Sequence, residues 1–107
     1  MNVIDQHIDE LKKFCANYHV AELYVFGSIV KGNFSDNSDI DFLVRFSGVN
    51  PLDYFDNYMD FKADLEKLYC RNIDLVEMQT IKNPILKKSI DRDKKIVYGR
   101  ENSKMAV

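Results

Sequence analysis

The hydrophobic positions of this 107-residue chain fall into helical and strand-like segments that alternate along the sequence. Ile4, Ile8, Leu11 and Tyr18 recur at helical spacing, so we expect an amphipathic helix over about residues 3–18. Residues 20–26 are almost all apolar and rich in β-branched and aromatic side chains, which is typical of a strand buried on both faces. The remaining segments are predicted as a helical turn at 28–31, a strand at 39–46, a helix at 51–69, a strand at 72–77, a helix at 83–91 and a strand at 95–98.

The length and composition fit one small domain. A chain of 107 residues supports a single hydrophobic core, and 46% hydrophobic with 30% charged residues is ordinary for a globular protein. We therefore predict one domain over residues 1–99. Residues 100–107 show no hydrophobic periodicity, and we expect them to form a flexible C-terminal tail.

The charge and the apolar runs argue against several classes of function. A formal net charge of -2 gives no general attraction to nucleic acid, so we expect no direct nucleic-acid binding. No apolar run approaches the roughly 20 residues of a membrane span, and the first residues lack a signal-peptide pattern, so we expect no membrane contact and a cytoplasmic protein. Cys15 and Cys70 are each flanked by apolar or aromatic residues and are predicted to be reduced, semi-buried thiols.

Gly27 and Ser28 directly follow the first predicted strand. Glycine lets the backbone approach a ligand closely, and N–H groups at the start of a following helix favour anions. The pair therefore suggests a phosphate-binding turn, with Lys31 one turn further on as a mobile positive charge. A plain tight turn capped by Ser28, and a solvated Lys31, are the alternatives. Neither a Walker loop nor a dinucleotide fingerprint is present.

Two aspartates open the strand predicted at 39–46. Because side chains alternate along a strand, Asp39 and Asp41 should point to one face with Cα atoms about 6.5–7 Å apart, while Ile40 points into the core. Such a pair can converge on one divalent cation or flank two, and Mg²⁺ accepts one or two protein carboxylates together with phosphate oxygens and water. A solvated strand start is the alternative, and the upstream glycine–serine pair favours the metal site.

A third acid, Asp74, lies inside the apolar strand predicted at 72–77. If this strand lies beside the one that carries Asp39 and Asp41, Asp74 joins the carboxylate cluster. It could then ligate a second metal or accept a proton from an attacking hydroxyl. An edge-strand acid that faces water is the alternative, and Glu77 is a neighbouring rival for the same role.

Gly27-Ser28, Asp39-Ile40-Asp41 and the later acid Asp74 together resemble the signature of the DNA polymerase β-like nucleotidyltransferase superfamily. The small size and the segments 26–32 and 38–44 resemble the minimal nucleotidyltransferases, the antitoxins that pair with HEPN toxins. The resemblance extends over about residues 3–99. It implies an α/β (α+β) fold with a small mixed β-sheet and helices on one side.

The resemblance also implies a site and a reaction. The three aspartates would be catalytic and bind Mg²⁺, and Gly27 with Ser28 would hold the nucleotide triphosphate. Members of this group transfer AMP from ATP to a tyrosine of the partner toxin, an RNase of the HEPN class, in type VII toxin–antitoxin pairs. Lys31 stands where relatives commonly carry arginine, so a bidentate contact with phosphate is lost there.

Two other functions fit the same residues. The chain could be a non-catalytic nucleotide-binding module that neutralises its partner by contact, or a subunit of a small-molecule nucleotidyltransferase. A double Asp39→Asn, Asp41→Asn variant separates AMP transfer to a partner protein from neutralisation by contact, because it abolishes the first and leaves the second intact. Labelled metabolite made by the chain alone would indicate the small-molecule nucleotidyltransferase.

Overall fold

The computed structural model describes residues 2–99, and every statement about the structure refers to these residues. The helices are α1 (Asn2–Asp5), α2 (Ile8–Asn17), α3 (Ser28–Lys31), α4 (Tyr54–Tyr69) and α5 (Pro84–Asp93), with short 3-10 helices η1 (Pro51–Asp53) and η2 (Met78–Thr80). The strands are β1 (Val20–Phe26), β2 (Ile40–Phe46), β3 (Ile73–Glu77) and β4 (Lys95–Gly99). The predicted tail at 100–107 lies outside the described residues.

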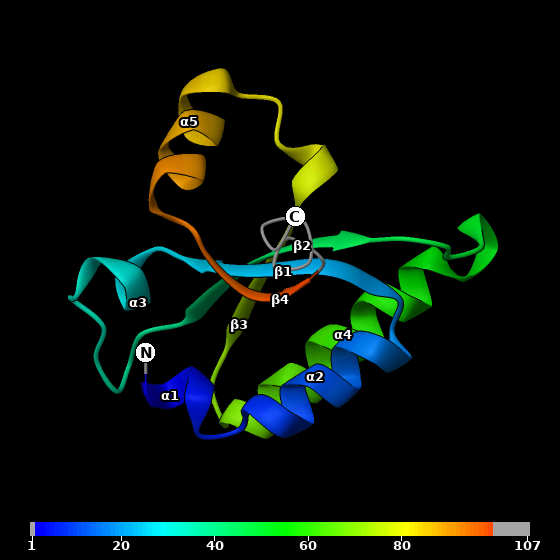
Figure 1. Ribbon diagram of the computed structural model, residues 1–107, viewed down its shortest axis with the longest axis horizontal. Coiled ribbons are helices and arrows are strands. Elements are labelled where there is room, and N and C mark those ends of the chain that lie inside the picture. The colour runs from blue at the N-terminus through cyan, green and yellow to red at the C-terminus, as the bar shows by residue number, and fades with distance from the viewer. Residues whose placement is uncertain (1, 100–107) are drawn as a thin grey trace, which may run out of the picture.

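The four strands form one mixed sheet in the order β3-β2-β1-β4. β1 is antiparallel to both β2 and β4, whereas β2 and β3 are parallel. Parallel neighbours need a crossover connection, and α4 supplies it between β2 and β3 (Figure 1). The predicted mixed sheet is therefore confirmed, and β3 lies beside the strand that carries Asp41.

The main core lies between one face of the sheet and helices α2 and α4. Strand residues at alternate positions point into it, because successive side chains of a strand face opposite sides. The fully buried members from the strands are Leu23, Val25, Ile40, Phe42 and Val44, and those from the two helices are Leu11, Cys15, Phe61 and Leu65. Figure 1 shows α2 and α4 side by side below the sheet.

The opposite face of the sheet is covered by α5, which corrects the expectation that the helices lie on one side. Tyr24 of β1 and Leu43 of β2 point to this face and form a small second core with Ile90 of α5. These three residues are buried, with 3%, 1% and 5% of their surface exposed. Since both sets of alternate strand positions are apolar, the second face also needs cover, and η2 and α5 arch over it (Figure 1).

The helix predicted at 3–18 is divided in two. Tyr69 is buried in the main core and its hydroxyl donates a hydrogen bond to the carbonyl oxygen of Ile4, at 3.2 Å. The same carbonyl accepts the N–H of His7 at 3.3 Å, which is a turn rather than an α-helical bond. α1 therefore ends at Asp5 and α2 begins at Ile8.

The two cysteines lie in different environments, and both are free thiols. Cys15 is fully buried, and burial raises the pKa of its thiol to about 12. Cys70 is exposed and caps α4 with a φ of 54°, so the expectation of a semi-buried thiol is wrong there. Among residues 2–99, no helix combines the length and the apolar character that crossing a membrane requires.

Candidate active site

The turn after β1 has a backbone conformation that favours glycine, and Gly27 rather than the expected Ser28 takes the cap position of α3. Gly27 has a φ of 78° and a ψ of -147°, a combination that is essentially restricted to glycine. Its carbonyl oxygen accepts the N–H groups of Val30 and Lys31, both at 3.0 Å, so α3 starts directly at Ser28. The first N–H groups of a helix have no partner within it, and those of Ser28 and Ile29 are therefore left for an anion.

Asp41 lies directly against this turn. In the antiparallel pair of β1 and β2, Phe26 is opposite Asp41. The carboxylate of Asp41 therefore lies next to Gly27, the residue that follows Phe26 in the chain. A Cβ atom on Gly27 would lie only 2.1 Å from Oδ2 of Asp41. A larger residue would therefore force the Asp41 side chain to move, which adds to the preference for glycine that the positive φ already sets.

The third predicted acid also lies next to Asp41. In the parallel pair of β2 and β3, Asp41 is in register with Asp74, and the two side chains share the face that α5 covers. Adjacent strands are about 4.8 Å apart, so the two carboxylates are neighbours. Glu77 is in register with Val44 at the other end of β3 and is therefore not in the cluster.

Asp39 borders the same cluster from outside the sheet. β2 starts at Ile40, one residue later than predicted, so Asp39 is the last residue of the preceding loop and is exposed. Burial is the largest cause that raises the pKa of Asp41, followed by the charges of Asp74 and then Asp39. The three carboxylates therefore lie within electrostatic reach of one another.

Among residues 2–99, the cluster has no positive partner in a salt bridge. No salt bridge of the described residues includes Asp39, Asp41 or Asp74. Within residues 2–99, no three acidic, histidine or cysteine side chains form a ready-made cage for a metal ion. Mg²⁺ does not need such a cage, because it uses one or two protein carboxylates and completes its octahedron with phosphate oxygens and water. The carboxylate oxygens and their uncompensated charge fit this ion.

A hollow of about 170 Å³ lies beside the turn, between the end of β1 and α5. Its walls are formed by Phe26, Gly27 and Lys31 on one side and by Leu86, Ser89, Ile90 and Asp93 on the other. Lys31 Nζ lies 3.9 Å from Oδ2 of Asp93, so the predicted phosphate-binding lysine has an acidic partner in α5. This pair could not be found from the sequence, because the two residues come together only through the placement of α5.

Arg71 supports the loop that leads into Asp39, and the sequence analysis did not identify it. Its Nη1 donates hydrogen bonds to the carbonyl oxygens of Ser35 and Ser38, at 3.1 and 2.9 Å. Its guanidinium also lies over the ring of Phe34, 4.5 Å from the centroid. Arg71 thus fixes the backbone on the N-terminal side of the acid pair.

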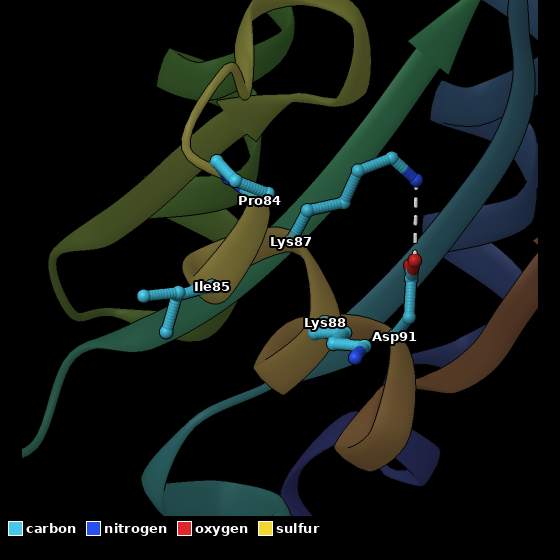
Figure 2. A pocket seen from close by; sticks show the side chains of 5 residues that line it. All are labelled: Pro84, Ile85, Lys87, Lys88 and Asp91. Atoms are coloured by element: carbon cyan, nitrogen blue, oxygen red, sulfur yellow. Dashed lines mark hydrogen bonds and ion pairs between the residues drawn. The ribbon is translucent and has the colours of Figure 1, made fainter.

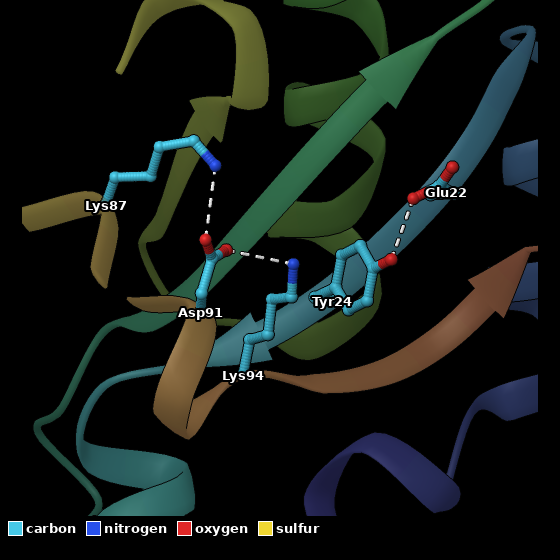
Figure 3. Close-up of polar contacts among 5 residues, drawn as sticks. All are labelled: Glu22, Tyr24, Lys87, Asp91 and Lys94. Carbon is cyan, nitrogen blue, oxygen red and sulfur yellow. Dashed lines mark hydrogen bonds and ion pairs between the residues drawn. The ribbon is translucent and has the colours of Figure 1, made fainter. Parts of the chain in front are cut away.

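A chain of polar contacts connects α5 to the sheet (Figure 3). Asp91 accepts hydrogen bonds from Lys87 at 3.1 Å and from Lys94 at 3.0 Å. Lys94 Nζ lies 4.4 Å from the centre of the Tyr24 ring, and the Tyr24 hydroxyl donates to Glu22 at 2.7 Å. Together with the buried Ile90, these contacts hold α5 above the site.

The fold and the site define a class of protein. A glycine turn with free N–H groups lies against paired carboxylates that suit a divalent cation, at one end of a mixed sheet, and this is the core of a nucleotidyltransferase. Residues 9–103 match the family described as Polymerase beta, Nucleotidyltransferase. The chain belongs to this family of enzymes.

Known proteins resemble the chain over most of its length. The protein adenylyltransferase MntA of Thermococcus cleftensis is 33% identical over 86 residues, which cover 80% of this chain and 81% of that protein. A Methanocaldococcus jannaschii protein assigned to the protein adenylyltransferases is 37% identical over 76 residues, 71% of this chain and 75% of that protein. A chain in the crystal structure of a toxin–antitoxin with AMP-PNP has the same fold, with a TM-score of 0.68, 19% identity, and coverage of 90% of this chain and 76% of that one.

Proposed function

We propose that this protein is a Mg²⁺-dependent protein adenylyltransferase that acts as the antitoxin of a toxin–antitoxin pair. It transfers AMP from ATP to a tyrosine of its partner, an RNase toxin of the HEPN class, in the cytoplasm. The predicted site residues take the following roles: Gly27, Ser28 and Lys31 bind the nucleotide, and Asp39, Asp41 and Asp74 bind the metal and carry the chemistry.

One observation carries the proposal: Asp41 lies between the glycine turn and Asp74. A triphosphate on the N–H groups of Ser28 and Ile29 is then next to the carboxylates that hold its cation. Lys31, at the edge of the hollow, can leave Asp93 and pair with a phosphate oxygen. Because the phosphates and the carboxylates are both negatively charged and lie side by side, one divalent cation between them can neutralise both.

In the proposed reaction, the phenolic oxygen of the acceptor tyrosine attacks the α-phosphorus of ATP. A P–O bond to tyrosine forms as the bond between the α-phosphorus and the α–β bridging oxygen breaks, and pyrophosphate leaves. The phenolic proton passes to Asp74, whose carboxylate is exposed beside Asp41. When bound, Mg²⁺ supplies charge neutralisation of the phosphates and lowers the pKa of the attacking hydroxyl.

The choice of a protein as acceptor is supported by the relatives. The two sequence relatives carry the name protein adenylyltransferase, and the structural neighbour is a toxin–antitoxin with AMP-PNP. A further structural neighbour is a minimal nucleotidyltransferase antitoxin in complex with a tri-AMPylated HEPN toxin of Shewanella oneidensis. The residues described above supply the nucleotide and metal chemistry that such a reaction needs.

The test is incubation of the purified chain with Mg-ATP and a HEPN-class RNase from the same organism, followed by intact-mass spectrometry. We expect the RNase to gain the mass of AMP on tyrosine and to lose its RNase activity. An Asp41→Asn variant should reduce this transfer about 100-fold or more, since metal stabilisation of the transition state amounts to several kcal/mol. Unchanged mass with the wild-type chain would overturn the proposal.

The same assay separates the two alternatives. If the RNase is inhibited with no gain of mass, and the Asp41→Asn variant inhibits equally, the chain neutralises by contact. If label from ATP enters a metabolite in the absence of the RNase, the chain is a small-molecule nucleotidyltransferase.

A further inference from the structure

α5 and the residues next to it form a basic segment on an otherwise acidic chain. Residues 82–95 contain six lysine and arginine residues and two aspartates, a formal charge of +4, whereas the whole chain has -2. A local charge of the opposite sign to the rest of the surface attracts a partner of complementary charge and orients it.

The outer surface of α5 also exposes large aliphatic side chains. Ile85 is 79% exposed and Leu86 is 50% exposed. Together with a neighbouring hollow of about 360 Å³, formed by Pro84, Ile85, Lys87, Lys88 and Asp91, this surface offers an apolar contact with charged edges (Figure 2). Ile85 and Lys87 extend to opposite sides of the helix in Figure 2.

Some of the positive charges here are already paired and some are not. Lys87 and Lys94 share Asp91, and Arg92 contacts Asp93. Lys82 and Lys88 have no acidic partner among residues 2–99, and both are exposed. The structure therefore leaves one cation on each side of Ile85 in the sequence, Lys82 and Lys88, for a ligand outside the chain. Lys95, at the start of β4, is also exposed and has no acidic partner among residues 2–99.

This surface adjoins the candidate active site. Leu86, which neighbours Ile85 on the first turn of α5, lines the hollow beside Gly27 and Lys31. A polypeptide that crosses the first turn of α5 beside Ile85 and Leu86 therefore lies at the edge of the hollow next to the turn that would hold the phosphates.

We propose that the outer surface of α5, defined by Lys82, Ile85 and Lys88, docks the protein that receives AMP. Its occupant is a segment of the acceptor that carries a large apolar side chain, seated beside Ile85, with Asp or Glu residues that pair with Lys82 and Lys88. This inference rests on the proposed function and adds the surface that selects the acceptor.

Nucleic acid is a less suitable occupant. Proteins that hold single strands combine basic residues with aromatic side chains on which bases stack, and residues 82–95 contain no aromatic residue. The exposed side chains between the lysines are aliphatic instead, and they suit an apolar side chain of a protein.

The experiment compares Ile85→Asp and Lys88→Glu with matched controls on distant surfaces. Leu52→Asp alters an exposed aliphatic residue at η1, at the far end of the molecule from α5 (Figure 1), and Lys12→Glu reverses an exposed charge on α2. The Kd of the HEPN-class acceptor is measured without ATP, the KM and kcat of AMP transfer with Mg-ATP, and the Kd of Mg-ATP by calorimetry.

We expect Ile85→Asp and Lys88→Glu each to raise the acceptor Kd and KM about fivefold or more, with kcat and the Kd of Mg-ATP unchanged. Leu52→Asp and Lys12→Glu should leave all four values as in the wild type. Higher salt should weaken acceptor binding by the wild type more than by Lys88→Glu.

Three results would overturn the inference: unchanged acceptor affinity in both α5 variants, a larger effect of the control variants, or competition of RNA with the acceptor for α5. Each of these requires that the wild-type chain labels its acceptor. If the wild type labels none, the proposed function itself fails, so the two failures are distinguishable.

Discussion

The carboxylate of Asp41 lies so close to Gly27 that a single added methyl group would collide with it, at 2.1 Å from Oδ2. The contact joins two strands, because Asp41 belongs to β2 and Gly27 follows β1. A side chain at position 27 would therefore have to displace the carboxylate of Asp41.

Gly27→Ala should consequently affect both stability and function. The φ of 78° costs an alanine about 1–3 kcal/mol, and the added Cβ displaces Asp41 as well. A displacement of about 1 Å at a catalytic group costs on the order of 100-fold in rate, and we expect a loss of AMP transfer of this size. The measurements are chemical denaturation and the rate of AMP transfer.

Gly48→Ala is the matched control. Gly48 has the same φ of 78°, but a Cβ there would have nothing within 4 Å. The control should therefore lose stability through backbone strain and retain the AMP-transfer rate. Equal loss of activity in the two variants would show that the contact with Asp41 is not important.

The charge of Asp41 predicts a second, pH-dependent effect. The pKa of Asp41 is raised above its ordinary value of 3.8, chiefly by burial and then by Asp74 and Asp39. A carboxyl group with a raised pKa in the folded state stabilises the fold at pH values below 3.8, and this contribution is lost as the pH rises through the higher, folded-state pKa. Metal-free protein at pH 7 therefore carries an unfavourable charge at this position.

Asp41→Asn should accordingly melt at a higher temperature than the wild type at pH 7 in EDTA. The difference should shrink at pH 3, where Asp41 is protonated in both states. Added Mg²⁺ and ATP should raise the melting temperature of the wild type more than that of Asp41→Asn, because a ligand stabilises only the state that binds it. A lower melting temperature of the variant at pH 7 in EDTA would contradict this account.

The sequence predicted the local parts of the site better than the long-range ones. The strand at 20–26 was predicted with the observed bounds, because a run of strand formers meets a glycine there. The helical turn ends at Lys31 as predicted, but Ser28 is its first residue and not its cap, because Gly27 takes the cap position. The sequence predicts that Asp74 joins the acid pair only if its strand lies beside the strand of Asp41. The structure meets this condition, because β2 and β3 are neighbours and Asp41 is in register with Asp74.

Three features could not be predicted because they depend on contacts between distant residues. The periodicity of residues 84–93 indicates an amphipathic helix, but it does not specify which face of the sheet the helix covers. The break between α1 and α2 coincides with the hydrogen bond from the Tyr69 hydroxyl to the carbonyl oxygen of Ile4, and the acidic partner of Lys31 depends on the position of α5. The catalytic and binding roles of the site residues stay predictions until they are measured.

The ion pair of Lys31 and Asp93 predicts opposite effects for its two members. An exposed pair contributes about 1 kcal/mol at most, which corresponds to about fivefold in affinity. Asp93→Asn should free Lys31 for phosphate and lower the Kd of Mg-ATP by up to about fivefold, whereas Lys31→Met should raise it. Isothermal titration calorimetry with a non-hydrolysable ATP analogue measures both. If Lys31→Met binds as tightly as the wild type, Lys31 is a surface lysine and has no nucleotide contact.

The last prediction concerns Arg71, which acts on the site through the backbone of the preceding loop. Its Nη1 holds the carbonyl groups of Ser35 and Ser38, and without it the loop loses two charge-assisted hydrogen bonds of roughly 1.5–3 kcal/mol each at most. Arg71→Ala should therefore speed amide hydrogen exchange at residues 35–39 and lower kcat for AMP transfer several-fold. Arg71→Lys should restore only part of both, because lysine keeps the charge but loses the planar contact over Phe34. Exchange rates that stay at the wild-type level while kcat falls would show instead that Arg71 contacts the nucleotide itself.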